Sequence, residues 1–336
     1  MRAARWFAAR SVRLVELDRP EPGDGEVLVQ VAYCGICGSD LHGYLDGPHA
    51  IPVRHAHPVS GRAAPLTLGH EFSGTVAATG NGVRGVTEGD PVAVEPHYRC
   101  GTCAQCRSGR YNICAGFGFA GLMGDGGLAE FACVPEYMVH RLPPHIDLAQ
   151  AAVLEPAAVA LHAIRRSGLV PGTDCLIVGL GPIGLLLGLL ARKAGAREVI
   201  GVDPSANRRA VAPTLGFTRT LEKPDGTTVP LAFEAVGSQT AFDTALATLQ
   251  PGGECVLLGL TDSLALPALA LINAEQKLTT SVGYRNAHGE LIALLAAGAL
   301  DLAPLITSVI PLESVVDKGF ERLLGAREEI KILVRP

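Results

Sequence analysis

The segment Cys175–Asp203, CLIVGLGPIGLLLGLLARKAGAREVIGVD, is predicted to form a strand, a glycine turn, a helix and a second strand. The apolar run Leu176–Leu180 leads into GLGPIG, and a helix-compatible run follows directly. In such a turn Gly179 permits the tight bend, Gly181 lets a pyrophosphate approach the backbone, and Gly184 allows the helix to pack closely on the strand. The helix N-terminus then presents free N–H groups to the phosphates. This order of elements predicts a dinucleotide-binding turn.

The acid that ends the second strand bears on which dinucleotide binds. Asp203 would accept hydrogen bonds from the adenosine ribose hydroxyls and repel a 2′-phosphate, which favours NAD over NADP. Arg208 is expected to reach the adenosine side, although Arg208 and Arg209 would equally suit a solvated helix face, and their charge would soften the preference for NAD. The expected cofactor contacts are Gly179, Gly181, Pro182, Ile183, Gly184, Asp203 and Arg208, with Val236 and Arg285 at strand ends near the nicotinamide.

The composition of the 336-residue chain restricts the class of protein. A hydrophobic content of 48% with 18% charged residues indicates large cores, and the length allows two domains. The net charge of −5 argues against nucleic acid as a partner. The run Leu176–Ala191 is shorter than the about 20 residues of a membrane span and contains Gly-Pro, so no membrane association is expected.

The cysteines and the N-terminal sequence indicate the cellular compartment. MRAAR lacks the apolar core of a secretory signal, so a reducing cytoplasm is expected. Nine cysteines in such a chain indicate metal ligands rather than disulfides. Four of them lie close together as Cys100-x2-Cys103-x2-Cys106-x7-Cys114, a spacing that suits one closed tetrahedral metal site, with free thiols or a redox pair as the alternative. Cys34, Cys133, Cys175 and Cys255 are expected to be small buried residues.

The pattern of strands and helices predicts an α/β protein with two domains. Short strands separated by turns fill the first part, at Val12–Leu17, Glu26–Tyr33, Glu71–Thr79, Asp90–Val94 and Ala129–Val134. A helix is expected near Leu148 and again after Pro156, over Ala157–Arg166. Strands then alternate with helices as in a doubly wound parallel sheet, with strands at Leu176–Leu180, Glu198–Asp203, Leu231–Val236, Glu254–Leu260 and Leu278–Tyr284. The closing strand Ile330–Val334 is expected to rejoin the first domain.

Four further residues have the chemistry of a catalytic zinc site but are scattered along the chain. Cys37 lies in CGICGSDLH, His70 and Glu71 in LGHEFSG, and Glu155 in LEPAAVALHA. Three protein ligands of these types with one open position form a catalytic zinc site. Single residues of this kind at turns are more often structural, so their types alone do not decide the matter.

Taken together in this order and spacing, CGICGSDLH, GHEFSG, EPAAVALHA and GLGPIG resemble the zinc-dependent medium-chain alcohol and polyol dehydrogenases, over essentially the whole chain. The resemblance implies a GroES-like catalytic domain over 1–152 and 286–336, with a structural zinc lobe at about 97–115. It implies a Rossmann NAD-binding domain over 153–285 and an active site in the cleft between the domains. A homodimer or homotetramer is also implied.

The resemblance also implies roles for individual residues. Cys37, His70 and Glu155 would surround the catalytic zinc, and Glu71 would ligate transiently or act from beside it. Ser39 would receive the substrate proton and His42 would pass it toward solvent. The four thiolates Cys100, Cys103, Cys106 and Cys114 would hold one structural zinc. Together with NAD, these make one catalytic and one structural zinc per subunit.

Within the family the chain looks closest to the 2,3-butanediol (acetoin) dehydrogenases. The resemblance rests on the long segment between Cys37 and His70, on GFAGLMGDGGLAEF at Gly118–Phe131, on GYR at Gly283–Arg285 and on the C-terminal KILVRP. It implies hydride transfer between a vicinal diol and its ketone, with zinc as Lewis acid. A larger polyol or a bulky or cyclic secondary alcohol, of sorbitol or threonine dehydrogenase type, is the alternative substrate. A zinc-free quinone or enoyl reductase and a non-catalytic NAD-binding scaffold are the alternative classes.

One segment departs from the family pattern. Phe217–Pro230, FTRTLEKPDGTTVP, has room for a short strand and a turn only, where family members have a strand and a full helix. Parallel strands ordinarily need a longer crossover. One peripheral helix of the nucleotide domain is therefore expected to be missing.

Overall fold

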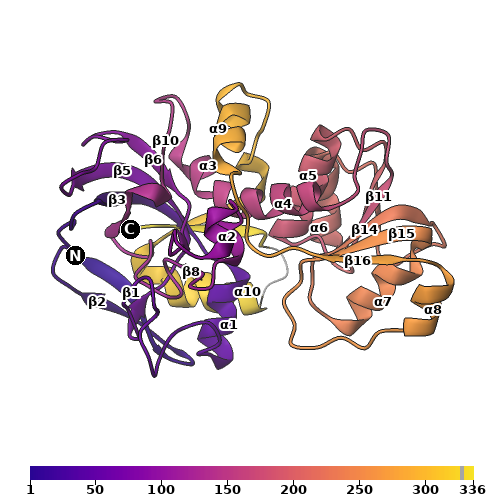
Figure 1. Ribbon diagram of the computed structural model, residues 1–336, viewed down its shortest axis with the longest axis horizontal. Helices are drawn as coiled ribbons and strands as arrows, with labels where there is room; N and C mark the ends of the chain where they lie inside the picture. Colours follow the sequence, from indigo (N-terminus) through magenta and orange to yellow (C-terminus); the bar gives the residue numbers. More distant parts are fainter. Residues whose placement is uncertain (326–328) are drawn as a thin grey trace. The chain divides into compact units, whose positions relative to one another are not determined.

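The computed structural model describes residues 1–325 and 329–336, and the chain divides into two compact units. Unit 1 contains Met1–Glu155 and His288–Pro336, and unit 2 contains Pro156–Ala287. Figure 1 shows the order of the elements along the chain.

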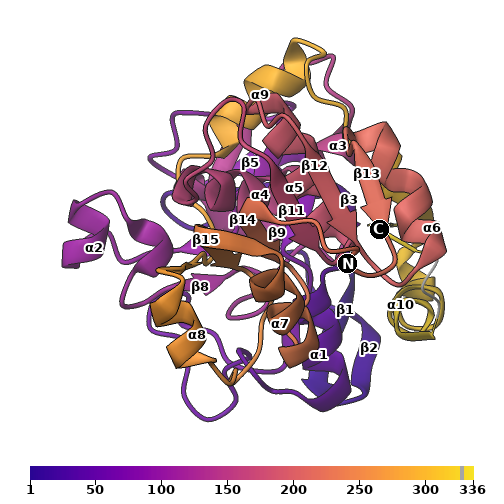
Figure 2. The ribbon, with the colours of Figure 1, turned by 90° about the vertical axis from the view of Figure 1, so that its right-hand side faces the viewer.

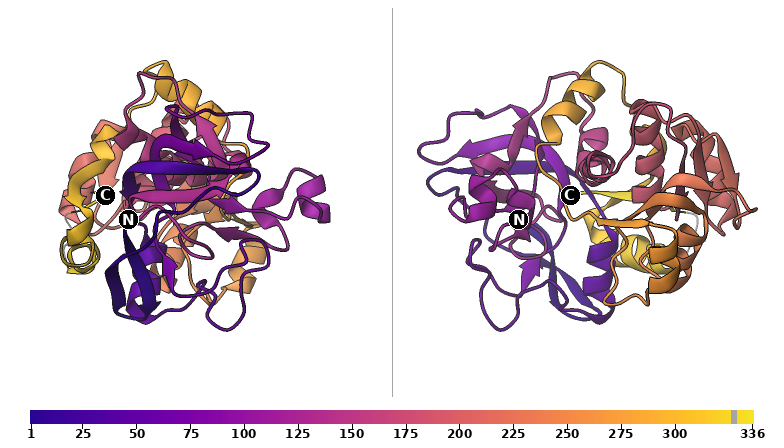
Figure 3. Two further views of the ribbon diagram at one scale, coloured as in Figure 1. Left: turned by 90° about the vertical axis from the view of Figure 1, so that its left-hand side faces the viewer. Right: turned by 45° about the vertical axis from the view of Figure 1, so that its right-hand side comes forward.

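The core of unit 1 is a sheet built around the central strand β3 (Glu26–Gly35). β3 pairs antiparallel with β5 (Glu71–Thr79), with β9 (Phe131–Pro135) and, near its end, with β18 (Lys331–Arg335). The last strand of the chain therefore lies beside one of the first, and Figure 3 shows this return of the yellow C-terminal segment to the strands drawn in indigo and purple. The predicted return of the closing strand to the first domain is confirmed.

The other elements of unit 1 surround this sheet. They are β1 (Arg2–Ala8), β2 (Ser11–Glu16), β4 (Leu66–Thr67), β6 (Pro91–Val94), β7 (His97–Tyr98), β8 (Gly118–Phe119), β10 (Val139–Arg141), β17 (Ile306–Pro311), α1 (Gly38–Asp46), α2 (Ala104–Arg107), α3 (Leu148–Ala152), α9 (His288–Ala296) and α10 (Glu321–Gly325). Short 3-10 helices cover Tyr111–Ile113, Glu136–Met138, Ala303–Leu305 and Leu312–Ser314, and a π-helix covers Val315–Phe320. The main sheet has the order β10-β6-β5-β3-β18-β17, while β2-β1-β4 and β7-β8 form smaller sheets.

Unit 2 is a parallel sheet with the strand order β13-β12-β11-β14-β15-β16, and Figure 2 labels the first five of these strands. The strands are β11 (Cys175–Val178), β12 (Val199–Val202), β13 (Arg219–Leu221), β14 (Val229–Glu234), β15 (Leu249–Leu257) and β16 (Lys277–Thr280). The helices are α5 (Pro182–Lys193), α6 (Ala206–Val211), α7 (Gln239–Ala247) and α8 (Ala268–Asn273), with a 3-10 helix at Ala212–Leu215. The two-domain α/β prediction with a doubly wound parallel sheet is confirmed.

The shortened crossover is also confirmed. Residues 222–228, between β13 and β14, contain no helix. A turn closes this segment instead, in which the Asp225 carboxylate accepts hydrogen bonds from the backbone N–H and the hydroxyl of Thr227 and pairs with Arg219. The nucleotide turn itself follows β11 and lies outside this segment.

Several predicted elements have different bounds in the structure, among them the strand expected over Glu254–Leu260, which is β15 over Leu249–Leu257. α4 (Leu154–Arg166) begins before Pro156 rather than after it. Proline is tolerated there because its missing N–H belongs to the first turn, where N–H groups have no partner within the helix. The strand expected over Leu278–Tyr284 ends at Thr280, since β16 pairs with β15 only as far as Leu257.

None of the helices in residues 1–325 and 329–336 combines the length and the apolar character needed to span a bilayer.

Candidate active site, thiolate lobe and nucleotide turn

Three of the scattered residues meet in unit 1. One ligand atom each from Cys37, His70 and Glu71 lies within 4.8 Å of the other two. Cys37 precedes α1, while His70 and Glu71 stand at the start of β5, and the pairing of Gly35 with Glu71 places the two segments side by side. His70 and Glu71 are buried, and Cys37 is half-buried. The donor set is therefore thiol, imidazole and carboxylate, which are the ligand types of a catalytic zinc site.

Asp40 contacts both segments of this cluster, the one with Cys37 and the one with His70. One of its carboxylate oxygens accepts the backbone N–H of Cys37 at 2.9 Å, which caps the first turn of α1. The other lies 3.6 Å from Nδ1 of His70. A carboxylate at Nδ1 orients the ring and leaves Nε2 as the ligand atom. The sequence motif CGICGSDLH was not used to predict a role for Asp40. The signal for such a role is its position three residues after Cys37 at the start of a helix.

The surroundings of His70 favour a positive charge. Burial alone would lower the pKa of His70, but Asp40 and Cys37 raise it well above its ordinary value. Asp40 and Cys37 thus favour a positive charge at the imidazole, either a proton or a cation in its place.

Glu71 is held by a buried lysine. Nζ of Lys331 lies 2.7 and 2.6 Å from the two carboxylate oxygens of Glu71 and donates a third hydrogen bond to the carbonyl of Ile36 at 3.0 Å. Burial would lower the pKa of Lys331, but Glu71, Cys37 and Glu155 raise it above its ordinary value. Gly35 makes room for this pair, because a Cβ there would come within 2.1 Å of the Glu71 carboxylate. Lys331, within KILVRP, is the second residue whose role sequence reasoning missed.

The structure does not bring Glu155 into the group of atoms within 4.8 Å. Glu155 is buried near the start of α4, and its charge acts on Lys331. Of the expected ligands, Cys37, His70 and Glu71 are therefore assembled, and Glu155 lies nearby.

Ser39 and His42 lie on α1. The Ser39 hydroxyl is 3.3 Å from Nε2 of His70, so it stands beside the expected ligand atom. His42 is exposed, and its ring faces that of His49 at a centroid distance of 6.0 Å. The hydroxyl is thus at the cluster, while the imidazole of His42 lies at the solvent surface.

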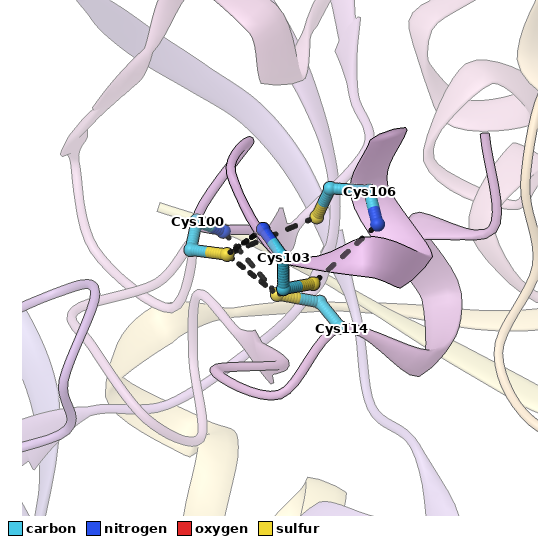
Figure 4. Close-up of side chains that lie close together, drawn as sticks. All are labelled: Cys100, Cys103, Cys106 and Cys114. Atoms are coloured by element: carbon cyan, nitrogen blue, oxygen red, sulfur yellow. Dashed lines mark hydrogen bonds between the residues drawn. The ribbon is translucent and has the colours of Figure 1, made fainter. Parts of the chain in front are cut away.

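The four cysteines of the second constellation converge in unit 1, as Figure 4 shows. Their sulfurs are 3.5 Å apart for Cys100 and Cys114, 3.9 Å for Cys103 and Cys114, and 4.0 Å for Cys100 and Cys106. Zn–S bonds of about 2.3 Å place tetrahedral sulfurs about 3.8 Å apart. The spacing therefore fits one tetrahedral ion.

Backbone N–H groups stabilise thiolates in this lobe. The N–H groups of Cys103, Cys106 and Cys100 donate to the sulfurs of Cys100, Cys103 and Cys114, respectively. Hydrogen bonds from Thr102 and Cys103 lower the pKa of Cys100 to about 6, and those from Ala115 and Cys106 lower that of Cys103. Burial raises the pKa of the Cys106 thiol to about 12.

In unit 2 the glycine turn has the predicted geometry. Gly179 has a φ of 94°, in the left-handed region, and a Cβ at this position would meet the Val236 side chain at 2.5 Å. Gly181 is the residue before α5, with open space where a Cβ would stand, and Pro182 is the first helical residue. At Gly184 a Cβ would come within 1.7 Å of the Gly179 carbonyl oxygen. The conformation of Gly179 and the close packing at Gly184 therefore require glycine, while the open space at Gly181 is compatible with the predicted approach of a pyrophosphate. Ile183 follows within the first turn of α5.

Asp203 is fixed at the end of β12. Its two carboxylate oxygens accept the backbone N–H groups of Leu180 and Ser205, both at 2.8 Å. Arg208 lies 3.7 Å from the same carboxylate, while Arg209 donates to the Asp203 carbonyl at 2.7 Å. The carboxylate is thus tied directly to the glycine turn, and neither arginine is simply a solvated side chain.

The remaining two expected cofactor residues lie in different surroundings. Val236 follows β14 and touches the glycine turn at Gly179. Arg285 stands five positions beyond β16, its carbonyl accepts a hydrogen bond from Arg165, and its charge acts on His162. The structure places Val236, but not Arg285, against the turn.

Comparison with known proteins gives the class of this chain. The Alcohol dehydrogenase GroES-like domain family matches residues 23–144, and the Zinc-binding dehydrogenase family matches residues 182–297. The chain is 35% identical, over the full length of both proteins, to (R,R)-butanediol dehydrogenase of Bacillus subtilis (strain 168). The crystal structure of 2R,3R-butanediol dehydrogenase from Bacillus subtilis has a TM-score of 0.92 and 34% identity, covering 100% of this chain and 99% of that one.

A second solved structure is similar over the same length. It is a putative zinc-binding dehydrogenase from Sinorhizobium meliloti 1021 bound to NADP, with a TM-score of 0.91, 30% identity, and coverage of 100% of this chain and 99% of that one. The chain therefore belongs to the zinc-binding alcohol dehydrogenases. It is an oxidoreductase that acts on the CH–OH group of a small molecule, which confirms the predicted class.

Proposed function

We propose that this protein interconverts a vicinal diol such as 2,3-butanediol and its α-hydroxyketone, with NAD as hydride acceptor. The observation that carries the proposal is the cluster of Cys37, His70 and Glu71 with the Ser39 hydroxyl 3.3 Å from Nε2 of His70. The choice of a diol rests on the similarity to the butanediol dehydrogenase of Bacillus subtilis. Unit 1 is the proposed catalytic domain and unit 2 the proposed NAD-binding domain.

The donor set fits a catalytic zinc ion held by Cys37, His70 and one carboxylate. Both oxygens of Glu71 are engaged by Lys331, which favours Glu155 as the resting third ligand and leaves Glu71 for transient exchange. When bound, zinc supplies Lewis acidity that lowers the pKa of a substrate alcohol, and NAD supplies the site that accepts hydride.

The chain's own residues then manage the proton. As the alcohol is oxidised, its hydroxyl proton passes to Ser39 and its carbon-bound hydrogen leaves with two electrons as hydride, which gives ketone, NADH and one proton. Asp40 orients the His70 ring through Nδ1, which leaves Nε2 beside the Ser39 hydroxyl. His42, exposed on the same helix, is the proposed exit of the proton to solvent.

The four cysteines of the thiolate lobe would hold a second, structural zinc. The sulfur spacings fit such an ion, and four protein ligands leave no open position for chemistry. We therefore propose two zinc ions of these kinds per subunit, one catalytic and one structural.

NAD is the proposed cofactor because the Asp203 carboxylate ends β12 beside the glycine turn. Its oxygens are oriented by the N–H groups of Leu180 and Ser205 and retain capacity for a ribose hydroxyl. A 2′-phosphate would meet this negative charge. Arg208 offsets part of that charge, and the similar protein from Sinorhizobium meliloti binds NADP, so the preference must be tested with both cofactors.

A cytoplasmic location and a homodimer or homotetramer complete the proposal. The first rests on the cysteine content, and the second on family resemblance.

The first experiment follows NADH formation with the purified protein and a panel of alcohols. The panel contains the stereoisomers of 2,3-butanediol, sorbitol, threonine, simple secondary alcohols and bulky cyclic ones, each with NAD⁺ or NADP⁺, before and after a chelator. Chelator-sensitive turnover selective for one butanediol isomer is expected. Turnover confined to sorbitol, threonine or cyclic alcohols would overturn the diol but keep the chemistry, and NADH binding with no turnover by zinc-loaded protein would favour a scaffold.

A further inference from the structure

A third group of potential ligands lies in unit 1, built from Glu95, His140 and His288. One ligand atom from each lies within 4.8 Å of the other two. Glu95 directly follows β6, His140 is the middle residue of β10, and His288 is the first residue of α9. Neither the proposed catalytic cluster nor the thiolate lobe includes any of the three.

The three ligand atoms are close enough together to share one ion. Oε2 of Glu95 lies 2.8 Å from Nε2 of His140 and 3.9 Å from Nδ1 of His288. The two imidazoles are stacked at a centroid distance of 4.8 Å with an interplanar angle of 12°. Zn–N and Zn–O bonds of about 2.0 Å place tetrahedral donors about 3.3 Å apart, which is between these two donor distances.

A third imidazole lies beside the other oxygen of Glu95. Nδ1 of His97 lies 3.7 Å from Oε1 of Glu95. The His97 ring is completely buried and packs edge-on against Phe117 and Phe119, at centroid distances of 5.2 and 4.7 Å. A fixed imidazole behind a carboxylate is the kind of neighbour that orients metal ligands.

The charges in this group call for a cation. Glu95 is 3% exposed, and within residues 1–325 and 329–336 its ion-pair partners are imidazoles, with no lysine or arginine among them. A buried carboxylate is stabilised by pairing or by coordination of a metal ion, and imidazoles are common metal ligands.

We propose that Glu95, His140 and His288 bind a divalent ion of the zinc class, with a water molecule in the fourth position. Access for the ion and the water is through His140, whose side chain is 30% exposed. The ion would tie the end of β6, the strand β10 and the start of α9 together. This makes it a third zinc site of the chain, independent of the two under the proposed function.

The test is metal content of the complete protein after growth with added Zn²⁺ and removal of loose ions by gel filtration. His140→Gln and His288→Gln are each expected to contain one zinc per chain fewer than the wild type. His55→Gln, a change of the same type at an exposed histidine outside the cluster, is expected to match the wild type. Circular dichroism establishes whether the variants are folded. Because His140 is partly exposed, His140→Gln still tests the loss of zinc if substitution of the buried His288 prevents folding.

Cobalt spectra assign the lost ion. Both other sites contain cysteine, so Co²⁺ there absorbs through thiolate-to-metal charge transfer in the near ultraviolet, whereas an ion held by two imidazoles and a carboxylate does not. The wild-type minus His140→Gln difference spectrum is expected to show visible Co²⁺ bands without a thiolate band. Equal metal content in folded wild type and His140→Gln, or a difference spectrum with a thiolate band, would overturn the proposal and leave Glu95 and His140 as a hydrogen-bonded pair.

Discussion

Lys331 and Glu71 form an ion pair in the core of unit 1, with side chains 2% and 0% exposed and Nζ 2.6 Å from the nearer carboxylate oxygen. The two residues come from β18 and β5, which flank β3 on opposite sides. Because Glu71 adjoins His70, this ion pair fixes the orientation of the Glu71 carboxylate relative to the proposed catalytic cluster.

Removing the lysine alone should destabilise the protein strongly. Lys331→Met leaves the Glu71 carboxylate buried without its counter-charge, which typically costs about 3–5 kcal/mol. The double variant Glu71→Gln with Lys331→Met removes both charges and should recover much of this loss. The measurement is the free energy of unfolding in urea, with Lys318→Met, at an exposed lysine, as the matched control expected to change stability by less than about 0.5 kcal/mol. An unfolding free energy of Lys331→Met equal to that of the control would contradict this role of the pair.

Two glycines of the nucleotide turn should separate folding from cofactor binding. Gly184→Ala places a Cβ within 1.7 Å of the Gly179 carbonyl oxygen, and such overpacking costs about 1–3 kcal/mol. Gly181→Ala meets nothing within 4 Å, so its stability should be nearly unchanged. The added methyl group of Gly181→Ala is nevertheless expected to obstruct the pyrophosphate and weaken NADH binding. Urea unfolding and NADH fluorescence titration test both statements, and tight NADH binding by Gly181→Ala would refute the placement of the pyrophosphate.

The Asp203 carboxylate should decide between the two nicotinamide cofactors. Asp203→Asn keeps the shape and one acceptor for the N–H groups of Leu180 and Ser205 but removes the charge. The ratio of kcat/KM for NAD⁺ to that for NADP⁺ is expected to fall by about tenfold or more, equivalent to about 1.4 kcal/mol. Asp243→Asn, on the exposed face of α7, is the control. If both variants keep the wild-type ratio, another residue sets the preference.

His162 should make stability depend on pH in the acidic range. Burial, together with Arg166, Arg285 and Arg165, lowers the pKa of His162 to about 4, below the ordinary value of 6.5. Between these values the unfolded chain binds a proton that the folded protein does not, so stability is complete above pH 6.5 and declines as the pH falls toward 4. The slope contributed by one such group is at most about 1.4 kcal/mol per pH unit. Urea unfolding from pH 4.5 to 7 should show a shallower decline for His162→Gln than for wild type; parallel curves would refute the contribution.

Much of the architecture was predictable because its signals are local. The strand, glycine turn and helix around Gly179–Gly184 lie in one continuous segment, as do the four cysteines of the lobe. Local signals were less reliable where a neighbour decides the outcome: β16 ends at Thr280 because its partner strand ends, and α4 accepts Pro156 because the first turn does not need its N–H.

The sequence by itself determined the class of protein, the parallel sheet with its nucleotide turn and the short crossover after β13. It also determined that the four cysteines of the lobe lie together. Only the tertiary structure decided which partners meet from distant segments. Lys331 reaches Glu71 because β18 and β5 both flank β3, and Glu95, His140 and His288 converge from β6, β10 and α9. The physical reason is that such contacts follow from strand pairing and burial in the folded core, and no spacing along the chain records which buried charges will compensate one another.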